Sequence, residues 1–137
     1  MKEKHMRFGD FIRKKRLDDP RELTQLKVAE HLGISLQYLS AIEIRRKAPP
    51  SGDKLELLAR FLNLSEEDTA LMFDLASRES REVPYDIEDT LMYEDVGDLI
   101  RYATRQSKAG FIEEADWKSF IRQMEEKKKS KEADGDG

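Results

Sequence analysis

The side chains with the clearest chemical potential lie in one short stretch, where small polar residues precede a run of cations. Gln37 and Ser40 stand about one helical turn apart, and Arg45, Arg46 and Lys47 follow them closely. A glutamine amide offers the paired donor and acceptor that match the major-groove edge of adenine, and a serine hydroxyl can donate or accept. Arginine and lysine pair with phosphate. The chemistry indicated is recognition of DNA through hydrogen bonds and ion pairs.

The sequence lacks the residue sets that covalent chemistry or metal binding requires. It contains no cysteine and only two histidines, His5 and His31, which excludes a thiolate nucleophile and argues against a zinc site. It has no glycine-rich phosphate loop and no glycine–serine elbow. We therefore expect no enzyme activity, no catalytic residue, no metal and no cofactor. No apolar run approaches the roughly 20 residues that cross a bilayer, so we expect a soluble cytoplasmic protein that does not enter a membrane.

Charge is distributed unevenly along the 137 residues. The whole chain has 25 basic and 29 acidic side chains and a net charge of −4. Residues 1–60 contain 14 basic and 9 acidic side chains, whereas residues 61–137 contain 11 and 20. Such asymmetry is expected when one part of a chain faces a polyanion and the other faces solvent or a partner.

Hydrophobic periodicity predicts the helices that must position these residues. A basic amphipathic helix is expected over 6–17, with an inner face formed by Phe8, Phe11, Ile12 and Leu17. Two further helices are expected over 53–62 and 65–76, the second opening on a serine cap followed by acids.

Two short helices joined by a tight turn are expected between the first helix and the helix over 53–62. Thr24 and Ser35 are suited to N-caps, and Gly33 suits the left-handed turn that closes a helix. Leu39 and Ile42 would face inward from the second of these helices, over 35–44. Two short helices joined in this way are typical of a helix-turn-helix.

These positions carry a family resemblance, which covers about residues 7–76. The chain resembles the lambda-repressor and Cro (XRE-type) family of helix-turn-helix transcriptional regulators. The resemblance implies an all-α fold, with a five-helix DNA-binding domain over 1–78 and a C-terminal helical extension. The residues that carry it are Leu23-Thr24-Gln25, Val28-Ala29, Leu32-Gly33-Ile34-Ser35, Tyr38-Leu39-Ser40, Ile42-Glu43, Arg45-Arg46-Lys47 and Pro49-Pro50.

The resemblance also assigns roles to individual positions. It makes 35–44 the recognition helix, whose outer face would read bases in the major groove of double-stranded DNA. It places Gln25 at a position that grips phosphate, beside two helix N-termini that favour anions. The predicted DNA-binding residues are Thr24, Gln25, Ser35, Leu36, Gln37, Ser40, Ala41, Arg45, Arg46 and Lys47.

One position departs from the family pattern. Arg45 stands where glycine is usual. If the position requires a positive φ angle, arginine costs about 1 kcal/mol relative to glycine. If instead the recognition helix runs further, the roles of Arg45 and Arg46 change.

The second half of the chain is acidic. Residues 79–126 are expected to form a helical extension, and their apolar residues need a dimer interface, a partner protein or the fifth helix to cover them. Residues 127–137 have no apolar group worth burying, and we expect a disordered tail there. The first part of the extension, residues 82–98, contains seven acidic residues and no basic one: Glu82, Asp86, Glu88, Asp89, Glu94, Asp95 and Asp98.

The prediction from sequence is a sequence-specific transcriptional regulator, acting as a repressor and a homodimer. Dimerisation would let two domains read two half-sites about 34 Å apart. Two alternatives stay open. The chain could be an antitoxin-type regulator that holds a partner protein through residues 80–124, or the helix-turn-helix could serve as a protein-interaction module.

Overall fold

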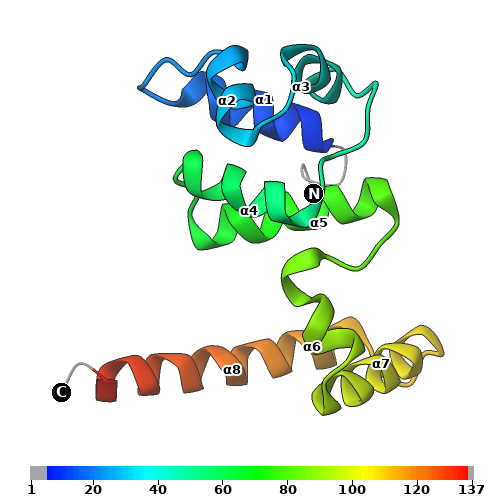
Figure 1. Ribbon diagram of the computed structural model, residues 1–137. Helices are drawn as coiled ribbons and strands as arrows, with labels where there is room; N and C mark the ends of the chain where they lie inside the picture. The colour runs from blue at the N-terminus through cyan, green and yellow to red at the C-terminus, as the bar shows by residue number, and fades with distance from the viewer. Residues whose placement is uncertain (1–5, 136–137) are drawn as a thin grey trace. The chain divides into compact units, whose positions relative to one another are not determined.

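The structure is a computed structural model that describes residues 6–135. Within this range every regular element is a helix, which confirms the predicted all-α class (Figure 1). The chain divides into two compact units, one ending at Glu88 and the other beginning at Asp89.

The first unit contains the five predicted helices. Three of them begin at a hydroxyl cap: the backbone N–H groups of Lys27 and Tyr38 donate to Thr24 and Ser35, and that of Asp68 donates to the hydroxyl of Ser65. These bonds satisfy N–H groups that have no partner inside the helix. The helices are α1 (Phe8–Asp18), α2 (Gln25–Leu32), α3 (Leu36–Glu43), α4 (Gly52–Phe61) and α5 (Glu66–Ser80).

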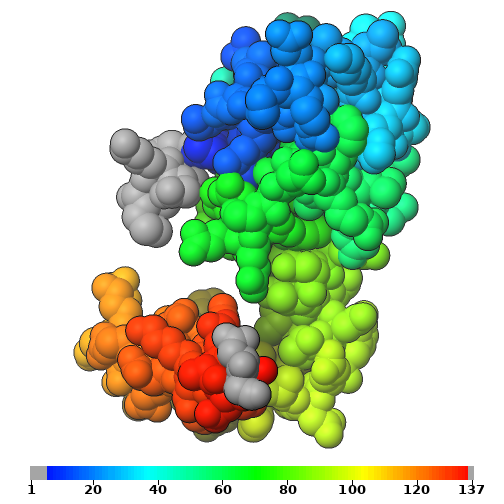
Figure 2. All heavy atoms as spheres, turned by 90° about the vertical axis from the view of Figure 1, so that its left-hand side faces the viewer, coloured from blue at the N-terminus to red at the C-terminus, as the bar shows by residue number. Residues whose placement is uncertain are grey.

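One hydrophobic core holds these five helices together. Helix α1 packs on α3 and α5, while α2 packs on α3 and α4. Figure 2 shows the blue, cyan and green segments closing over one another as one body. The fully buried large side chains are Phe8, Ile12, Val28, Leu39, Leu58, Met72 and Leu75.

The inner face of α1 differs from the prediction at its last turn. Leu17 was expected to face inward, but it is 58% exposed, and Arg16 is buried in its place. Residues four apart lie on one side of a helix, so Phe8, Ile12 and Arg16 share the inner face and Leu17 is turned about 100° away. The prediction for Leu17 was wrong because it ranked an apolar side chain above the helical period.

A guanidinium group anchors the loop between α1 and α2. Arg21 donates to both carboxylate oxygens of Asp19, at 2.9 and 2.8 Å, and to the backbone oxygen of Phe61 at 2.6 Å. Hydrogen bonds from the Arg21 side chain and backbone lower the pKa of Asp19 from 3.8 to about 2. The loop is thereby tied to the end of α4.

The first unit extends beyond residue 78, where sequence placed its end. A short 3₁₀ helix, η2 (Tyr85–Ile87), packs against α5. The Tyr85 ring stacks on Phe73 with ring centres 6.3 Å apart, and it lies so close to Gly52 that any larger residue there would collide with it. The connection after α5 therefore belongs to the first unit.

The second unit contains α6 (Glu88–Met92) from its second residue onward, α7 (Asp95–Lys108) and α8 (Glu114–Gly135). Among its described residues only Gly97 is buried. The indole N–H of Trp117 donates to the Ser107 hydroxyl at 2.8 Å, which joins the start of α8 to the end of α7. The unit thus has regular helices but no hydrophobic core of its own.

Helix α8 continues where sequence predicted a disordered tail. The structure keeps the helix through Gly135, and residues 136–137 lie outside the described range. Glutamate, lysine and alanine dominate residues 125–133, and all are good helix formers. The prediction of disorder weighed the lack of apolar side chains and left intrinsic helix propensity out.

Candidate nucleic-acid interface

The turn between α2 and α3 sets the direction of the proposed recognition helix. Gly33 adopts a left-handed conformation with φ of 69°, and its N–H bonds back to α2. The next residue, Ile34, donates to the backbone oxygen of Ala29 at 3.0 Å. Ser35 then caps α3 by accepting from the N–H of Tyr38 at 3.0 Å. The predicted turn and both predicted caps are confirmed.

Helix α3 has one buried side and one open side. Leu39 and Ile42 are each 2% exposed and belong to the core. Gln37 is exposed on the opposite side, while Ser40 and Ala41 are half-buried. The outer side of α3 therefore combines the polar side chains of Gln37 and Ser40 with apolar ones such as Leu36 and Ala41, and a helix can use both kinds to contact base edges and thymine methyl groups.

A shallow hollow of about 410 Å³ lies along this outer side. It combines residues from the start of α2, from α3 and from the segment after α3. Six of the seven lining residues are predicted DNA-binding residues. The other is Ile44, which was not predicted and is 56% exposed. Sequence could have indicated Ile44, because residues 37, 40, 41 and 44 lie on one side of a helix. The lining residues are Gln25, Leu36, Gln37, Ser40, Ala41, Ile44 and Arg46.

The basic segment leaves α3 through a left-handed residue. Arg45 has φ of 68°, and α3 ends at Glu43. The Arg45 N–H donates to the Ile42 oxygen at 3.0 Å, and the Arg46 N–H donates to the Ala41 oxygen at 2.8 Å. This is the Schellman pattern that glycine usually completes. Of the two possibilities for this position, the structure has the positive φ angle and not the longer helix.

The remaining predicted residues do not line the hollow, but each is next in sequence to a residue that does. Arg45 and Lys47 are exposed in the segment that follows α3. The hydroxyl oxygens of Thr24 and Ser35 already accept a hydrogen bond each from their own helix. Both residues nevertheless mark helix N-termini, where unpaired backbone N–H groups favour an anion.

A buried ion pair that sequence reasoning missed supports this surface from below. Arg16 donates to both carboxylate oxygens of Glu43 at 2.9 Å, and it also donates to the backbone oxygen of Leu23 at 3.1 Å. Glu43 accepts a further bond from the amide of Gln25 at 3.0 Å. The network ties α1, α2 and the end of α3 together. Sequence could have indicated the buried position of Arg16, because Arg16 follows Phe8 and Ile12 at intervals of four residues on one side of the helix.

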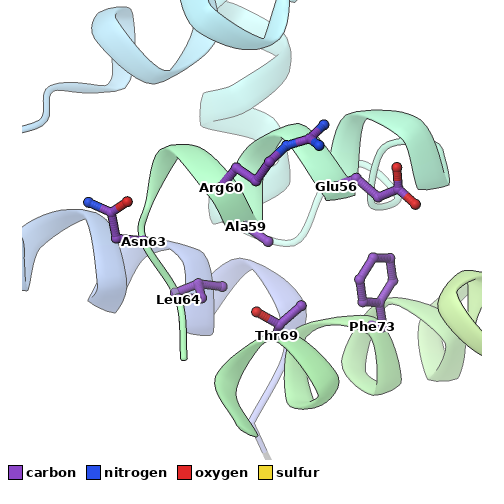
Figure 3. A pocket seen from close by; sticks show the side chains of 7 residues that line it. All are labelled: Glu56, Ala59, Arg60, Asn63, Leu64, Thr69 and Phe73. Atoms are coloured by element: carbon purple, nitrogen blue, oxygen red, sulfur yellow. The ribbon is translucent and has the colours of Figure 1, made fainter. Parts of the chain in front are cut away.

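A larger hollow, of about 570 Å³, lies between α4 and α5 and contains none of the predicted site residues. Leu64, Thr69 and Phe73 point toward α4 there, whereas Glu56 and Arg60 stand at its rim (Figure 3). These side chains present no nucleophile paired with a base. The hollow lies between α4 and α5 and shares no residue with the predicted DNA-binding set.

Two further findings concern the described part of the chain. Residues 6–135 hold no group of three or more histidine, aspartate or glutamate side chains placed to bind a metal ion. None of their helices combines the length and the apolar character needed to span a membrane.

The comparison with protein families bears on this surface. A helix-turn-helix family model matches residues 12–68, from the middle of α1 to the first turn of α5. Searches of the curated proteins and of the solved structures each gave no significant match. The matched range contains both capped helices, the glycine turn and all ten predicted site residues. Residues 12–68 are therefore similar to a helix-turn-helix domain of the lambda-repressor-like (XRE) type, the family whose resemblance the sequence carries, and that family binds DNA.

Proposed function

We propose that the protein is a sequence-specific transcriptional regulator that reads the major groove of DNA with α3. Gln37 would pair with an adenine edge, and Ser40 would adapt to either partner. The exposed apolar side chains of Leu36 and Ile44, with Ala41, would contact thymine methyl groups.

One observation carries this proposal. The hollow on the outer side of α3 collects residues from three separate segments, the start of α2, α3 itself and the basic exit, into one continuous surface. A recognition surface needs such continuity because base contacts and phosphate contacts are made at the same time.

Phosphate contacts would come from the edges of this surface. Arg45, Arg46 and Lys47 are exposed beside the C-terminal end of α3, and the N-termini of α2 and α3 lie at Thr24 and Ser35. These groups would supply affinity and salt dependence but little sequence preference.

We further propose that the regulator acts as a homodimer in the cytoplasm and represses by occupying promoter DNA. One such domain reads only a few base pairs, and a twofold pair of domains gains specificity from two half-sites. The second unit supports this proposal, because its exposed apolar side chains, among them Leu99 and Tyr102, have no core to enter.

The same exposed surface supports a second candidate, an antitoxin-type regulator. In that case, residues 80–124 would hold a partner protein while the first unit binds DNA. A second unit that becomes protected from proteolysis only in a complex with another protein would favour this candidate. A protease-resistant dimer of the purified chain would favour the homodimer.

The testing experiment is a titration of DNA from the region upstream of the coding sequence with the purified protein, at several salt concentrations. The double change Gln37→Ala/Ser40→Ala is compared with Gln123→Ala, which removes an exposed glutamine from α8. We expect selective binding that weakens with salt, and loss of selectivity in the double variant only. A folded protein that binds no DNA selectively would instead favour a protein-interaction module.

A further inference from the structure

Helix α8 and the residue before it carry a stripe whose chemistry changes along its length. Positions three and four apart lie on one side of a helix. On this side the first residues are acidic, the middle ones apolar and the last ones basic. The α8 stripe consists of Glu113, Glu114, Trp117, Phe120, Ile121, Met124, Lys127, Lys128 and Lys131.

The apolar middle of the α8 stripe is uncovered within one chain. Phe120 is 59% exposed and Ile121 is 48% exposed, and no described residue of α8 is buried. Helix α7 reaches only the start of the stripe, through the bond between Ser107 and Trp117. Figure 1 shows the later turns of α8, in orange and red, extending past α6 and α7. Such a helix depends on packing of its apolar face for stability.

We propose that α8 pairs with α8 of a second copy of this chain, in antiparallel orientation. Each acidic end would then lie opposite a basic end, and the two apolar middles would meet. With the twofold axis between Phe120 and Ile121, these two residues pack across it. Trp117 then lies opposite Met124, and Glu113 and Glu114 lie opposite Lys128 and Lys127.

The charge order identifies both the partner and the orientation. A parallel pair would place Glu114 beside Glu114 and Lys127 beside Lys127, and like charges repel. An acid–apolar–base order on one helix is complementary to itself only when reversed. Within one chain, Glu114 contacts Lys118 at 3.5 Å, but both side chains are exposed, so this ion pair competes weakly. Glu132 lies on the same side of α8 as Glu114, but it follows the segment 113–128 that the twofold axis pairs.

The inference supplies the interface of the homodimer proposed above and rests on that proposal. It is independent of base recognition by α3, because the α8 stripe contains none of the predicted DNA-binding residues.

Charge reversal in the full chain tests the interface by analytical ultracentrifugation without DNA. Glu113→Lys/Glu114→Lys and Lys127→Glu/Lys128→Glu should each raise the dimer Kd by about tenfold or more at low salt. An equal mixture of the two variants should restore dimers, since opposite charges face each other again. The control Arg122→Glu/Lys129→Glu changes the same amount of charge away from the stripe and should leave the Kd within about twofold.

Cysteine pairing tests the orientation, because the natural chain has no cysteine. A Glu114→Cys chain mixed with a Lys127→Cys chain should form a disulfide between unlike copies. A disulfide between two Lys127→Cys chains would indicate a parallel pair and overturn the proposal.

Two other results would overturn the interface. One is a wild-type chain that stays monomeric at about 100 µM, and the other is a dimer unaffected by both charge reversals. Circular dichroism checks that each variant keeps its helices. If the dimer test fails while selectivity still depends on Gln37, only the interface is wrong; if a charge-sensitive dimer binds no DNA selectively, the proposed function is wrong.

Discussion

Arg16 and Glu43 stand 27 residues apart in the chain, yet their side chains form a two-pronged ion pair with both N–O distances at 2.9 Å. Arg16 is 8% exposed and Glu43 is 3% exposed. The pair fixes the last turn of α3 against α1. The placement of α3, whose outer side is the proposed recognition surface, therefore involves a buried electrostatic contact in addition to hydrophobic packing.

Removing one partner of this pair should be costly. Glu43→Leu leaves the Arg16 guanidinium buried without a counter-charge, and we expect it to lower the free energy of unfolding by about 3–5 kcal/mol. The double change Arg16→Met/Glu43→Leu should recover much of that loss, because no charge then stays buried. Urea unfolding measures both variants against Glu30→Gln, an exposed acid of α2. Equal losses in the single and double variants would argue against the ion pair.

The strained position after α3 gives a prediction with opposite effects on stability and binding. Arg45→Gly should stabilise the fold by about 1 kcal/mol, because glycine adopts a positive φ angle without steric cost. It should also weaken DNA binding and reduce the salt slope by about 0.9 if Arg45 contacts a phosphate.

Arg46→Gly is the matched control for that change. It removes the same charge at a position whose φ angle is not positive, so it should not stabilise the fold. Thermal unfolding and salt-dependent DNA titration compare the two variants. A destabilised Arg45→Gly protein would show that the left-handed turn is not strained.

Close packing of α1 on the end of α3 predicts intolerance at Gly9. A Cβ atom at this position would collide with the backbone oxygens of Ile42 and Glu43. Gly9→Ala should therefore destabilise the fold by about 1–3 kcal/mol, although alanine is the better helix former. Lys14→Ala, an exposed change in the same helix, should stay within about 0.5 kcal/mol. Unfolding curves that place the two variants together would contradict this packing.

The Asp19–Arg21 contact predicts a stability contribution that is lost in acid. The pKa of Asp19 falls from 3.8 to about 2 on folding, so the contribution is present above pH 4 and disappears as the pH falls toward 2. A carboxyl NMR titration should give the lowered pKa in the wild type and an ordinary value in Arg21→Gln. An unchanged titration in that variant would assign the shift to another group.

Sequence predicted the five helices well because hydroxyl caps, a glycine turn and apolar periodicity agree along residues 7–76. It missed Arg16, since an arginine on an amphipathic helix is ordinarily assigned to the solvent face. Its partner lies 27 residues away, and no local pattern links the two. Helical geometry was enough to predict which residues of α3 face outward. That these residues share one hollow with Gln25 and Arg46 could be seen only in the tertiary structure.

The second unit was harder to predict for a different reason. Its apolar residues are spaced for helices, but nothing in the sequence says what they pack against, and only Gly97 is buried among the described residues. The end of α8 was missed because its residues are good helix formers, which favours a helix, but have no apolar side chains to bury, which favours disorder.

The hydrogen bond between Gln25 and Glu43 has a thermodynamic consequence for docking. The side-chain amide of Gln25 already donates a hydrogen bond, with an N–O distance of 3.0 Å, to a carboxylate that is itself held by Arg16. A glutamine side chain that is ordered before association loses less rotational entropy on meeting a phosphate, a saving of about 0.5–1.5 kcal/mol. Preorganisation of this one side chain would thus raise the affinity for DNA, independently of the bases that α3 reads.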